Sequence, residues 1–311
     1  MRIAVVGVGG VGGYFGGRLA QSGHDVVFIA RGTHLEALKN QGLRIDDPDG
    51  GSVAFPVKAT ADPSKIGKVD AIILGVKAWQ VADAAALMEP MIGPETFVVP
   101  LQNGVEAPSI LSEKLGPKHV FGGLCYIVSF IMGPGHIRHA GMKPFVTFGE
   151  LDNRVTERGS KLLDAFRSAD ISAETAPDIT SAMWQKFLFI ASVSGVGAVT
   201  RAPVGVVRSI PETRGLLQSA IEEVAAVALA RGVTLKENAV PATLNVIDSL
   251  PPGTTASMQR DIMDGRPSEL SFQSGSVVRL GAAAGTPTPV HSYLYSSLLP
   301  MELRARGDVE F

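Results

Sequence analysis

The first half of the chain alternates short apolar runs with segments of helical periodicity. The short runs predict strands at 2–6, 26–30, 70–75 and 96–100. The spacing of apolar positions between and after them predicts helices at 11–22, 33–40, 79–88 and 106–114. Strands that alternate with helices in this way form parallel sheets with helices on both faces. We therefore expect an α/β fold for this half.

Three further segments complete the expected α/β domain. Residues 42–60, rich in Gly, Asp and Pro, predict a hairpin or a loop insertion. Residues 119–149 are β-rich with Gly-Pro-Gly turns and predict extra, partly antiparallel strands at the sheet edge. A helix near 153–168 and a strand near 171–175 should follow and finish this domain.

After Pro177 almost every segment has helical periodicity. Helices are predicted at 178–193, 211–231, 238–248, 256–263, 270–284 and 290–305. The change of pattern near residue 176 predicts two domains. We expect an α/β domain at 1–176 and an all-helical domain at 177–311.

The first predicted strand ends in a glycine-rich turn that opens a helix. The turn reads Gly7-Val8-Gly9-Gly10-Val11-Gly12, which is the pattern G-x-G-x-x-G. The unpaired amide groups and the positive dipole end at such a helix N-terminus bind a pyrophosphate. A plain tight turn is the alternative, but a strand before the glycines and a helix after them favour dinucleotide binding. This predicts a dinucleotide-binding, doubly wound sheet in residues 1–176.

The residues after the second strand indicate which dinucleotide is bound. Sites for NAD place an Asp or Glu there to accept a hydrogen bond from the ribose hydroxyl. Here the strand runs into Arg31-Gly32-Thr33-His34, without a carboxylate. A guanidinium is suited to a 2′-phosphate, so Arg31 predicts NADP(H). A solvated loop arginine is the alternative.

Composition narrows the classes of function further. The 311 residues carry a formal net charge of -2, so no nucleic-acid partner is expected. The single cysteine, Cys125, excludes an internal disulfide, and the longest apolar stretch, 187–200, is too short to span a bilayer. The first strand leaves no room for a signal peptide, so we expect a cytoplasmic protein without a membrane partner. His136-x-x-His139 has no third ligand in view, and no metal is expected.

Polar side chains follow two strands that should end at the same edge of the sheet. Lys77 follows the strand 70–75, and Gln102-Asn103-Gly104 follows the strand 96–100. Ligands of open α/β sheets bind beyond the carboxyl ends of the strands. Each residue alone is more typical of a loop. Together they favour contacts with a dinucleotide or an anionic substrate.

The helical half offers a candidate proton donor. Lys186 lies in an otherwise apolar helix, where desolvation would lower its pKa toward the range of a general acid. A lysine that extends its ammonium to water is the alternative, and spacing alone does not decide between them. Ser257 and Glu269 also stand out, although a helix N-cap and a first-turn acid would explain them as well.

In their order and spacing these residues resemble the ketopantoate reductases (2-dehydropantoate 2-reductases). The resemblance runs over nearly the whole chain and rests on the glycine-rich turn, Arg31-Gly32, Lys77-Ala78-Trp79-Gln80, Gln102-Asn103-Gly104, Trp184-Gln185-Lys186, Ser257-Met258 and Glu269. It implies an NADP-binding Rossmann-type domain at 1–176 and a helical substrate and catalytic domain at 177–311. It also implies an NADP-dependent oxidoreductase that reduces a 2-oxo acid, 2-dehydropantoate, to pantoate on the route to pantothenate and coenzyme A.

The resemblance also implies a role for each matching residue. Lys186 is similar to the general acid, and Asn103 to an asparagine that contacts both cofactor and substrate. Lys77 resembles a lysine near the cofactor, and Ser257 a serine that holds substrate oxygen atoms. Glu269 is similar to an acid that contacts the nicotinamide-side ribose or the substrate hydroxyl, which makes it both a catalytic and a cofactor-binding candidate.

One part of the family pattern is missing. The family places asparagines four and eight residues after the catalytic lysine, where this chain has Ile190 and Ser194. Ser194 keeps a shorter hydrogen-bonding group for the substrate, whereas Ile190 keeps none. Three functions stay open: the ketopantoate reductase, a paralogous enzyme for another 2-oxo or 3-hydroxy acid, and a non-catalytic NADP-binding sensor. The sequence also leaves a homodimer open.

Overall fold

The computed structural model describes residues 1–311 and divides them into two compact units. We call Met1–Gln102 with Ala107–Ile179 the sheet unit, and Asn103–Glu106 with Thr180–Phe311 the helical unit. The short segment Asn103–Glu106 packs with the helices, although the change of sequence pattern assigned it to the first domain. Glu106 explains this difference, because its carboxylate accepts hydrogen bonds from Ser276 and, at 2.8 Å, from Arg279.

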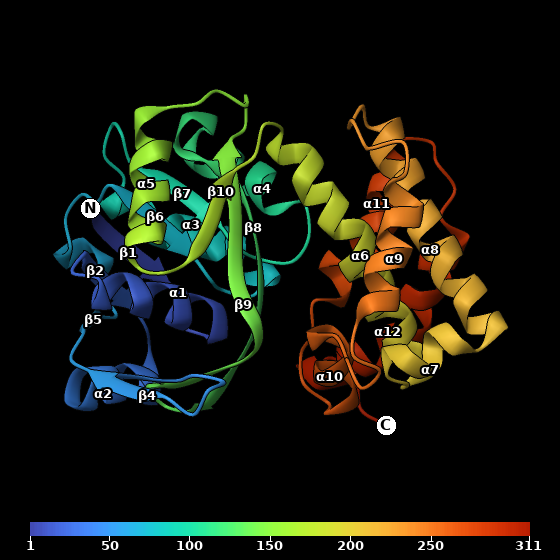
Figure 1. The fold of residues 1–311 in the computed structure, drawn as a ribbon, viewed down its shortest axis with the longest axis horizontal. Coiled ribbons are helices and arrows are strands. Elements are labelled where there is room, and N and C mark those ends of the chain that lie inside the picture. The colour runs from blue at the N-terminus through green and yellow to red at the C-terminus, as the bar shows by residue number, and fades with distance from the viewer. The chain divides into compact units, whose positions relative to one another are not determined.

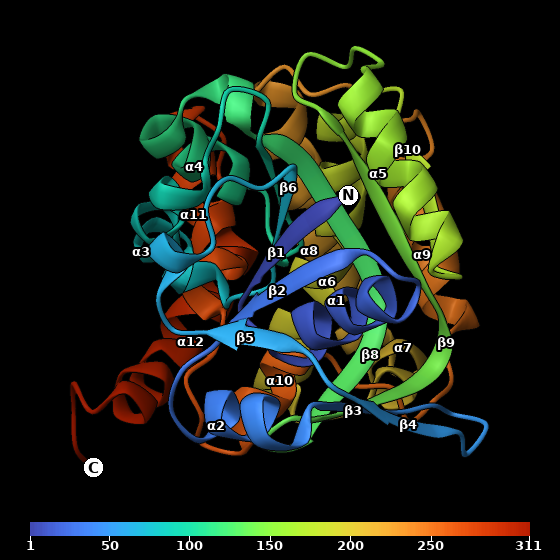
Figure 2. The ribbon, with the colours of Figure 1, turned by 90° about the vertical axis from the view of Figure 1, so that its left-hand side faces the viewer.

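A parallel sheet of five strands forms the core of the sheet unit (Figure 2). Its order is β5-β2-β1-β6-β7, from strands Lys58–Thr60, Asp25–Ile29, Arg2–Val6, Ala71–Leu74 and Phe97–Pro100. Every pair of neighbours is parallel. Successive residues of β1 alternate between two clusters: Ile3 and Val5 join one, Ala4 and Val6 the other. Because both faces are covered, the strands read as continuous apolar runs.

Helices cover the two faces of this sheet. The face with Ile3 and Val5 carries α1, α2 and α5, and the other face carries α3 and α4. Their bounds are Gly10–Gln21, Gly32–Gln41, Glu157–Ser168, Val81–Met88 and Ala107–Leu115. The order of strands reverses between β1 and β6, which is where doubly wound sheets bind dinucleotides. The Rossmann-type sheet predicted from the sequence is confirmed.

A second sheet corrects one expectation. The strands expected at the edge of the parallel sheet form a separate sheet, in which β10, β9, β3 and β4 follow one another and β8 pairs with β9. Their bounds are Ser172–Thr175, His136–Glu150, Leu43–Asp46, Ser52–Phe55 and Phe121–Gly133. The backbone pairing between β7 and this region is limited to the isolated bridge between Val98 and Val120. The separation has a packing reason, because Ile137 of β9 lies in the same apolar cluster as Phe15 of α1 and so helps to cover that helix.

One prediction about this second sheet has a clear outcome. The hairpin expected within 42–60 is confirmed, because β3 and β4 pair antiparallel. The two histidines of the H-x-x-H pattern lie on β9 and bond to protein groups. His136 Nε2 lies 2.7 Å from an Asp46 carboxylate oxygen, and His139 Nε2 lies 2.9 Å from the Met142 carbonyl. The His136 contact links β9 to its neighbour β3, whereas the His139 contact lies within β9.

The helical unit consists of seven α-helices and short connections (Figure 1). In order, α6 to α12 are Ile179–Thr200, Val204–Ser209, Pro211–Ala230, Ala239–Ser249, Ser257–Met263, Ser274–Ala283 and Pro289–Arg306. The short helix α7 was not predicted. The all-helical second domain of the predicted fold class is confirmed.

The central helix α6 is longer than its predicted range of 178–193. By length and composition alone its 22 residues could cross a membrane, because the helix extends beyond the 14-residue apolar stretch 187–200. However, 72% of its most apolar window is buried inside the protein. Apolar residues on all sides are typical of a helix that is surrounded by protein. The helix is therefore the core around which the others pack.

Candidate functional site

Three glycines of the turn after β1 have three different surroundings. Gly7 has a φ of +88°, which favours glycine, and Gly12 packs so closely that a Cβ there would lie 2.1 Å from the Gly7 carbonyl oxygen. By contrast, a Cβ on Gly9 would meet nothing nearer than Ile131 Cδ1, at 3.9 Å. A dinucleotide site needs a tight turn, an open approach to the backbone and close contact of helix and strand. These three glycines meet those needs in that order.

The N-terminus of α1 is suited to an anion. Gly9 is the N-cap, so no side chain accepts a hydrogen bond from the first amide groups. The first turn contains no acidic residue, and the Gly13 amide closes it on the Gly9 carbonyl at 2.7 Å. The amide groups at the start of such a helix are donors for phosphate oxygens. The residues Gly7 to Gly12 therefore fit a pyrophosphate.

Arg31 and Lys77 follow β2 and β6, the two strands on either side of β1 in the parallel sheet. Arg31 is exposed and forms the N-cap of α2, and only Ala30 separates it from β2. Lys77 follows β6 at the start of a 3₁₀ turn, and its ammonium lies 5.8 Å from the centre of the Trp79 ring. Both cations thus lie at the carboxyl edge of the sheet, where an anionic ligand binds.

Gln102 is a positioning residue whose separate role the sequence did not reveal. Its side chain is buried, and its amide nitrogen donates to the carbonyl oxygens of Leu74 at 2.9 Å and Val76 at 3.0 Å. It thereby ties the chain after β7 to the chain after β6. A carboxamide at a strand end was the only signal for it. The next residue in the chain is Asn103.

Lys186 and Asn103 are brought together although 83 positions separate them in the sequence. The Lys186 ammonium donates a hydrogen bond of 2.9 Å to Asn103 Oδ1. Lys186 is only 8% exposed, so its ammonium does not extend freely into water. The interpretation of Lys186 as a water-exposed lysine is therefore wrong.

Ser257 and Glu269 come from different segments that converge on one small apolar cluster. Ser257 is the first residue of α10 and follows the N-cap Ala256, so the N-cap interpretation of Ser257 is wrong. Glu269 is buried and precedes the 3₁₀ turn Leu270–Phe272. Their neighbours Met258 and Leu270 pack with Ala198 of α6 in the same cluster. Both polar residues are thus held beside the C-terminal half of α6.

A buried carboxylate anchors the segment that carries Glu269. Glu302 of α12 accepts hydrogen bonds from the Ser268 amide at 3.0 Å and the Ser268 hydroxyl at 2.5 Å. Arg306 completes the group, because it donates to Glu302 at 2.6 Å and to the Ser268 carbonyl at 3.1 Å. Because all these polar groups are paired, the backbone before Glu269 is held in one position. The sequence contained no signal for this anchor.

The two positions that depart from the family pattern lie one and two turns beyond Lys186 on α6. Residues four and eight apart lie on the same side of a helix. Ile190 packs against the apolar core of the helical unit, and Ser194 is fully buried. The Ser194 hydroxyl has no hydrogen-bond partner. Ile190 offers a substrate no polar group, whereas Ser194 offers a hydroxyl.

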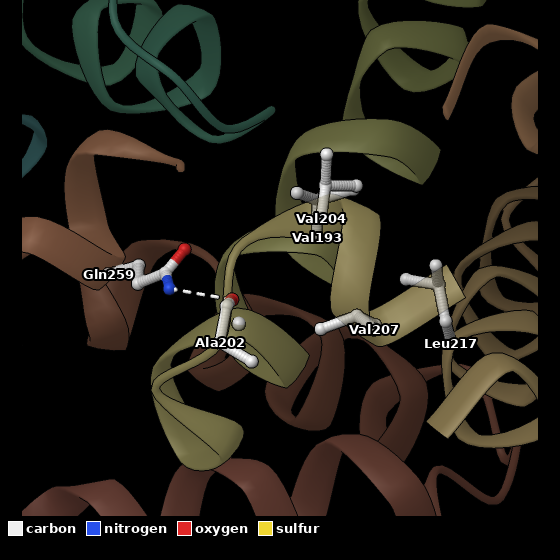
Figure 3. A pocket seen from close by; sticks show the side chains of 7 residues that line it. Val193, Ala202, Val204, Val207, Leu217 and Gln259 are labelled. Carbon is white, nitrogen blue, oxygen red and sulfur yellow. Dashed lines mark hydrogen bonds between the residues drawn. The ribbon is translucent and has the colours of Figure 1, made fainter. Parts of the chain in front are cut away.

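The helical unit also contains a small, mainly apolar pocket apart from these residues (Figure 3). It is lined by Val193, Gly197, Ala202, Val204, Val207, Leu217 and Gln259. Gln259 is its polar lining residue, and the Gln259 amide donates to the Ala202 carbonyl at 3.0 Å. None of the predicted site residues lines it. The pocket is therefore separate from the candidate site residues.

Comparison with known sequences points to one family for both units. Residues 3–153 match the family model described as ketopantoate reductase PanE/ApbA, and residues 178–302 match its C-terminal counterpart. An uncharacterized oxidoreductase of Bacillus subtilis, YkpB, is 30% identical over 96% of this chain and 98% of its own length. A 2-dehydropantoate 2-reductase of Mesorhizobium japonicum is 29% identical over 93% of this chain and 94% of its own length.

Solved structures agree with this assignment. A PanE/ApbA family ketopantoate reductase from Ralstonia eutropha has a TM-score of 0.89 at 30% identity, over 98% of this chain and all of that one. D-Mandelate dehydrogenase, solved with NADH and anilino(oxo)acetate, has a TM-score of 0.90 at 23% identity, over 98% of this chain and 99% of its own. The second likeness concerns the fold alone. The chain belongs to the ketopantoate reductase family and is an oxidoreductase of that family.

Proposed function

We propose that this protein reduces a 2-oxo acid with NADPH, and that the substrate is 2-dehydropantoate, which becomes pantoate. The hydrogen bond between Lys186 and Asn103 carries the proposal. It places a buried ammonium and a carboxamide together, and a 2-oxo acid reductase needs both a proton donor and a group that orients it. The family and the relative described as a 2-dehydropantoate 2-reductase support this substrate.

The proposed coenzyme site lies at the carboxyl edge of the parallel sheet. The amide groups from Gly9 to Gly12 would bind the pyrophosphate, and Lys77 would add a positive charge nearby. Arg31 would bind the 2′-phosphate of NADPH, because no carboxylate follows β2 to repel it. When bound, the coenzyme supplies a hydride to the carbonyl carbon of the substrate.

The residues of the helical unit would act on the substrate. Addition of a hydride leaves negative charge on the carbonyl oxygen, and the Lys186 ammonium stabilises that charge and then donates a proton to it. Asn103 holds the ammonium in position and contacts substrate and coenzyme. Ser257 binds oxygen atoms of the oxo acid. Glu269 accepts a hydrogen bond from the nicotinamide-side ribose or from a substrate hydroxyl.

One residue favours a second candidate substrate. Ile190 is an apolar side chain one helical turn beyond Lys186, where the family has an asparagine. It would suit a 2-oxo acid with a larger apolar side chain. The second candidate is therefore a paralogous reductase of an apolar 2-oxo acid.

A panel of 2-oxo acids with NADPH and with NADH tests the proposal. The purified protein is mixed with ketopantoate, phenylglyoxylate and 2-oxobutanoate, and oxidation of the coenzyme is followed by absorbance. Ketopantoate with NADPH should give a kcat/KM of about 10⁴ M⁻¹s⁻¹ or more. A clear preference for phenylglyoxylate would support the second candidate.

A measurement of NADPH binding shows whether a protein without activity still has the proposed coenzyme site. If the folded protein binds NADPH tightly but reduces none of these acids, and Lys186→Ala leaves that binding unchanged, the protein is an NADP-binding sensor. That result would overturn the proposed reaction while leaving the coenzyme site in place.

A further inference from the structure

Gln273 is a buried carboxamide that the proposed reaction does not use. It directly precedes α11 and is fully buried, yet neither its amide nitrogen nor its amide oxygen has a hydrogen-bond partner. Leaving such a group unpaired in the protein interior costs free energy, so native proteins rarely do so. A buried, unpaired carboxamide therefore calls for a function.

The neighbours of Gln273 hold it beside the residues that surround Lys186. A Cβ on Gly104, the residue after Asn103, would lie 3.0 Å from the Phe272 carbonyl oxygen. A Cβ on Gly195, the residue after Ser194, would lie 3.0 Å from the Ser274 hydroxyl. Gln273 lies between Phe272 and Ser274 in the chain. Its backbone is therefore held between the Asn103 segment and the middle of α6.

Two hydroxyl groups are buried without a hydrogen-bond partner, as the carboxamide of Gln273 is. Ser194 and Ser274 are also fully buried, and their hydroxyl oxygens have no hydrogen-bond partner. The three side chains combine donors and acceptors without any charge. Such a set matches a neutral hydroxyl, which both donates and accepts. It does not match a second carboxylate, which would need a cation.

We propose that Gln273, with the hydroxyls of Ser194 and Ser274, binds the hydroxyl group of a hydroxylated 2-oxo acid. Gln273 thereby supplies, from the position before α11, the carboxamide that the family pattern places on α6, where this chain has Ile190. This inference rests on the proposed function, because it concerns the same substrate. It makes Gln273 a specificity-determining residue, and it favours ketopantoate over an apolar 2-oxo acid.

The test compares two substrates that differ by one hydroxyl group. Ketopantoate and its 4-deoxy analogue are assayed with the wild-type protein and with Gln273→Leu, which keeps the volume of the side chain. The wild type should prefer ketopantoate by about a hundredfold or more in kcat/KM, because a site built for a hydroxyl is left unpaired by the analogue. Gln273→Leu should lose at least about tenfold of that preference and keep its activity on the analogue.

Thermal unfolding distinguishes this role from a structural one. If Gln273 serves the substrate, Gln273→Leu removes an unpaired polar group and should leave Tm unchanged or raise it. Gln259→Leu is the matched control. Gln259 is equally buried, but its amide nitrogen donates to the Ala202 carbonyl (Figure 3). Its amide oxygen accepts a hydrogen bond from the Ala256 amide. Gln259→Leu should therefore lower Tm and leave the substrate preference unchanged.

Each outcome either supports or overturns the inference. If wild type and Gln273→Leu show the same preference, or if the wild type shows none, the subsite does not exist. If Gln273→Leu does not fold, the conservative variant Gln273→Asn replaces it and should show a partial loss of preference.

If no 2-oxo acid is reduced, the proposed function fails and substrate binding decides about the subsite. Ketopantoate should then raise the Tm of the wild type more than its deoxy analogue does, and this difference should vanish in Gln273→Leu. Equal effects of the two acids on the wild-type Tm would overturn the subsite as well.

Discussion

The glycine-rich turn of the sheet unit and the α6 region of the helical unit are built in opposite ways. The turn presents backbone groups of consecutive residues. Its shape depends on glycines, which have no side chain. In the α6 region, the candidate side chains Asn103, Lys186, Ser257 and Glu269 come from four separate segments. One proposed site is local in the sequence, whereas the other depends on how the chain folds.

This difference indicates what each site tolerates. A backbone site presents the same donors whatever the neighbouring side chains are, provided that no Cβ enters it. A side-chain site depends on the residues that hold its members, such as Glu302 behind Ser268 and Gln102 before Asn103. We therefore expect coenzyme binding to be sensitive to single glycines, and substrate choice to drift with individual side chains.

Removal of the proton donor should have the largest effect. Lys186→Ala should lower kcat by about 100- to 10,000-fold, because the charge on the carbonyl oxygen loses both its stabilisation and its proton. Coenzyme affinity, measured by fluorescence titration, should change little. Lys161→Ala on α5 is the control, because Lys161 is exposed and pairs only with Glu157. If Lys186→Ala has the same kcat as the wild type, the α6 region does not take part in the reaction.

Two substitutions in the glycine-rich turn should have different effects, one on stability and the other on NADPH affinity. Gly12→Ala places a Cβ against the Gly7 carbonyl and should destabilise the protein by up to about 3 kcal/mol in urea unfolding. Gly9→Ala meets open space, so it should fold like the wild type and yet bind NADPH at least about tenfold more weakly. Unchanged NADPH affinity in Gly9→Ala would show that the open space is not used for the pyrophosphate.

The 2′-phosphate role of Arg31 predicts a change limited to one coenzyme. Arg31→Ala should raise the KM for NADPH by about tenfold to a hundredfold, as expected for loss of a charged hydrogen bond. The KM for NADH should stay near its wild-type value, and Lys39→Ala at the other end of α2 should affect neither. Equal changes for both coenzymes would contradict the assignment of NADPH.

Acid should weaken the helical unit through one buried histidine. Burial lowers the pKa of His291 from 6.5 to about 4, and its Nε2 lies 3.1 Å from the Ala220 carbonyl. Because the unfolded chain binds the proton more readily, stability falls as the pH drops from 6.5 toward 4. Urea unfolding should show a loss from this group of about 2 kcal/mol between pH 7 and pH 4.5.

A variant isolates the histidine from the other titrating groups. Burial raises the pKa of Glu223, which accepts the His291 amide, and this partly opposes the loss in acid. His291→Gln leaves Glu223 in place, so the difference between the two proteins reports His291 alone. The variant should lose less stability than the wild type in acid, and identical losses would exclude His291 as the cause.

The order of helices and strands could largely be predicted from the sequence, because periodicity and glycines act over a few residues. The strand β1, the turn Gly7 to Gly12 and the missing carboxylate after β2 are of this kind. The second sheet could not be placed in this way. Its separation from the parallel sheet depends on how β9 packs over α1, far away in the chain.

The amino-acid sequence by itself determined the family, the class of fold and the candidate residues, because each depends on residue type and spacing. Only the tertiary structure decided which of these residues meet. Asn103 accepts a hydrogen bond from Lys186 because the segment Asn103–Glu106 packs with the helical unit, where Glu106 pairs with Arg279. Gln273 stands out only because burial leaves its carboxamide unpaired. Burial and pairing are properties of the packed chain, and no local pattern encodes them.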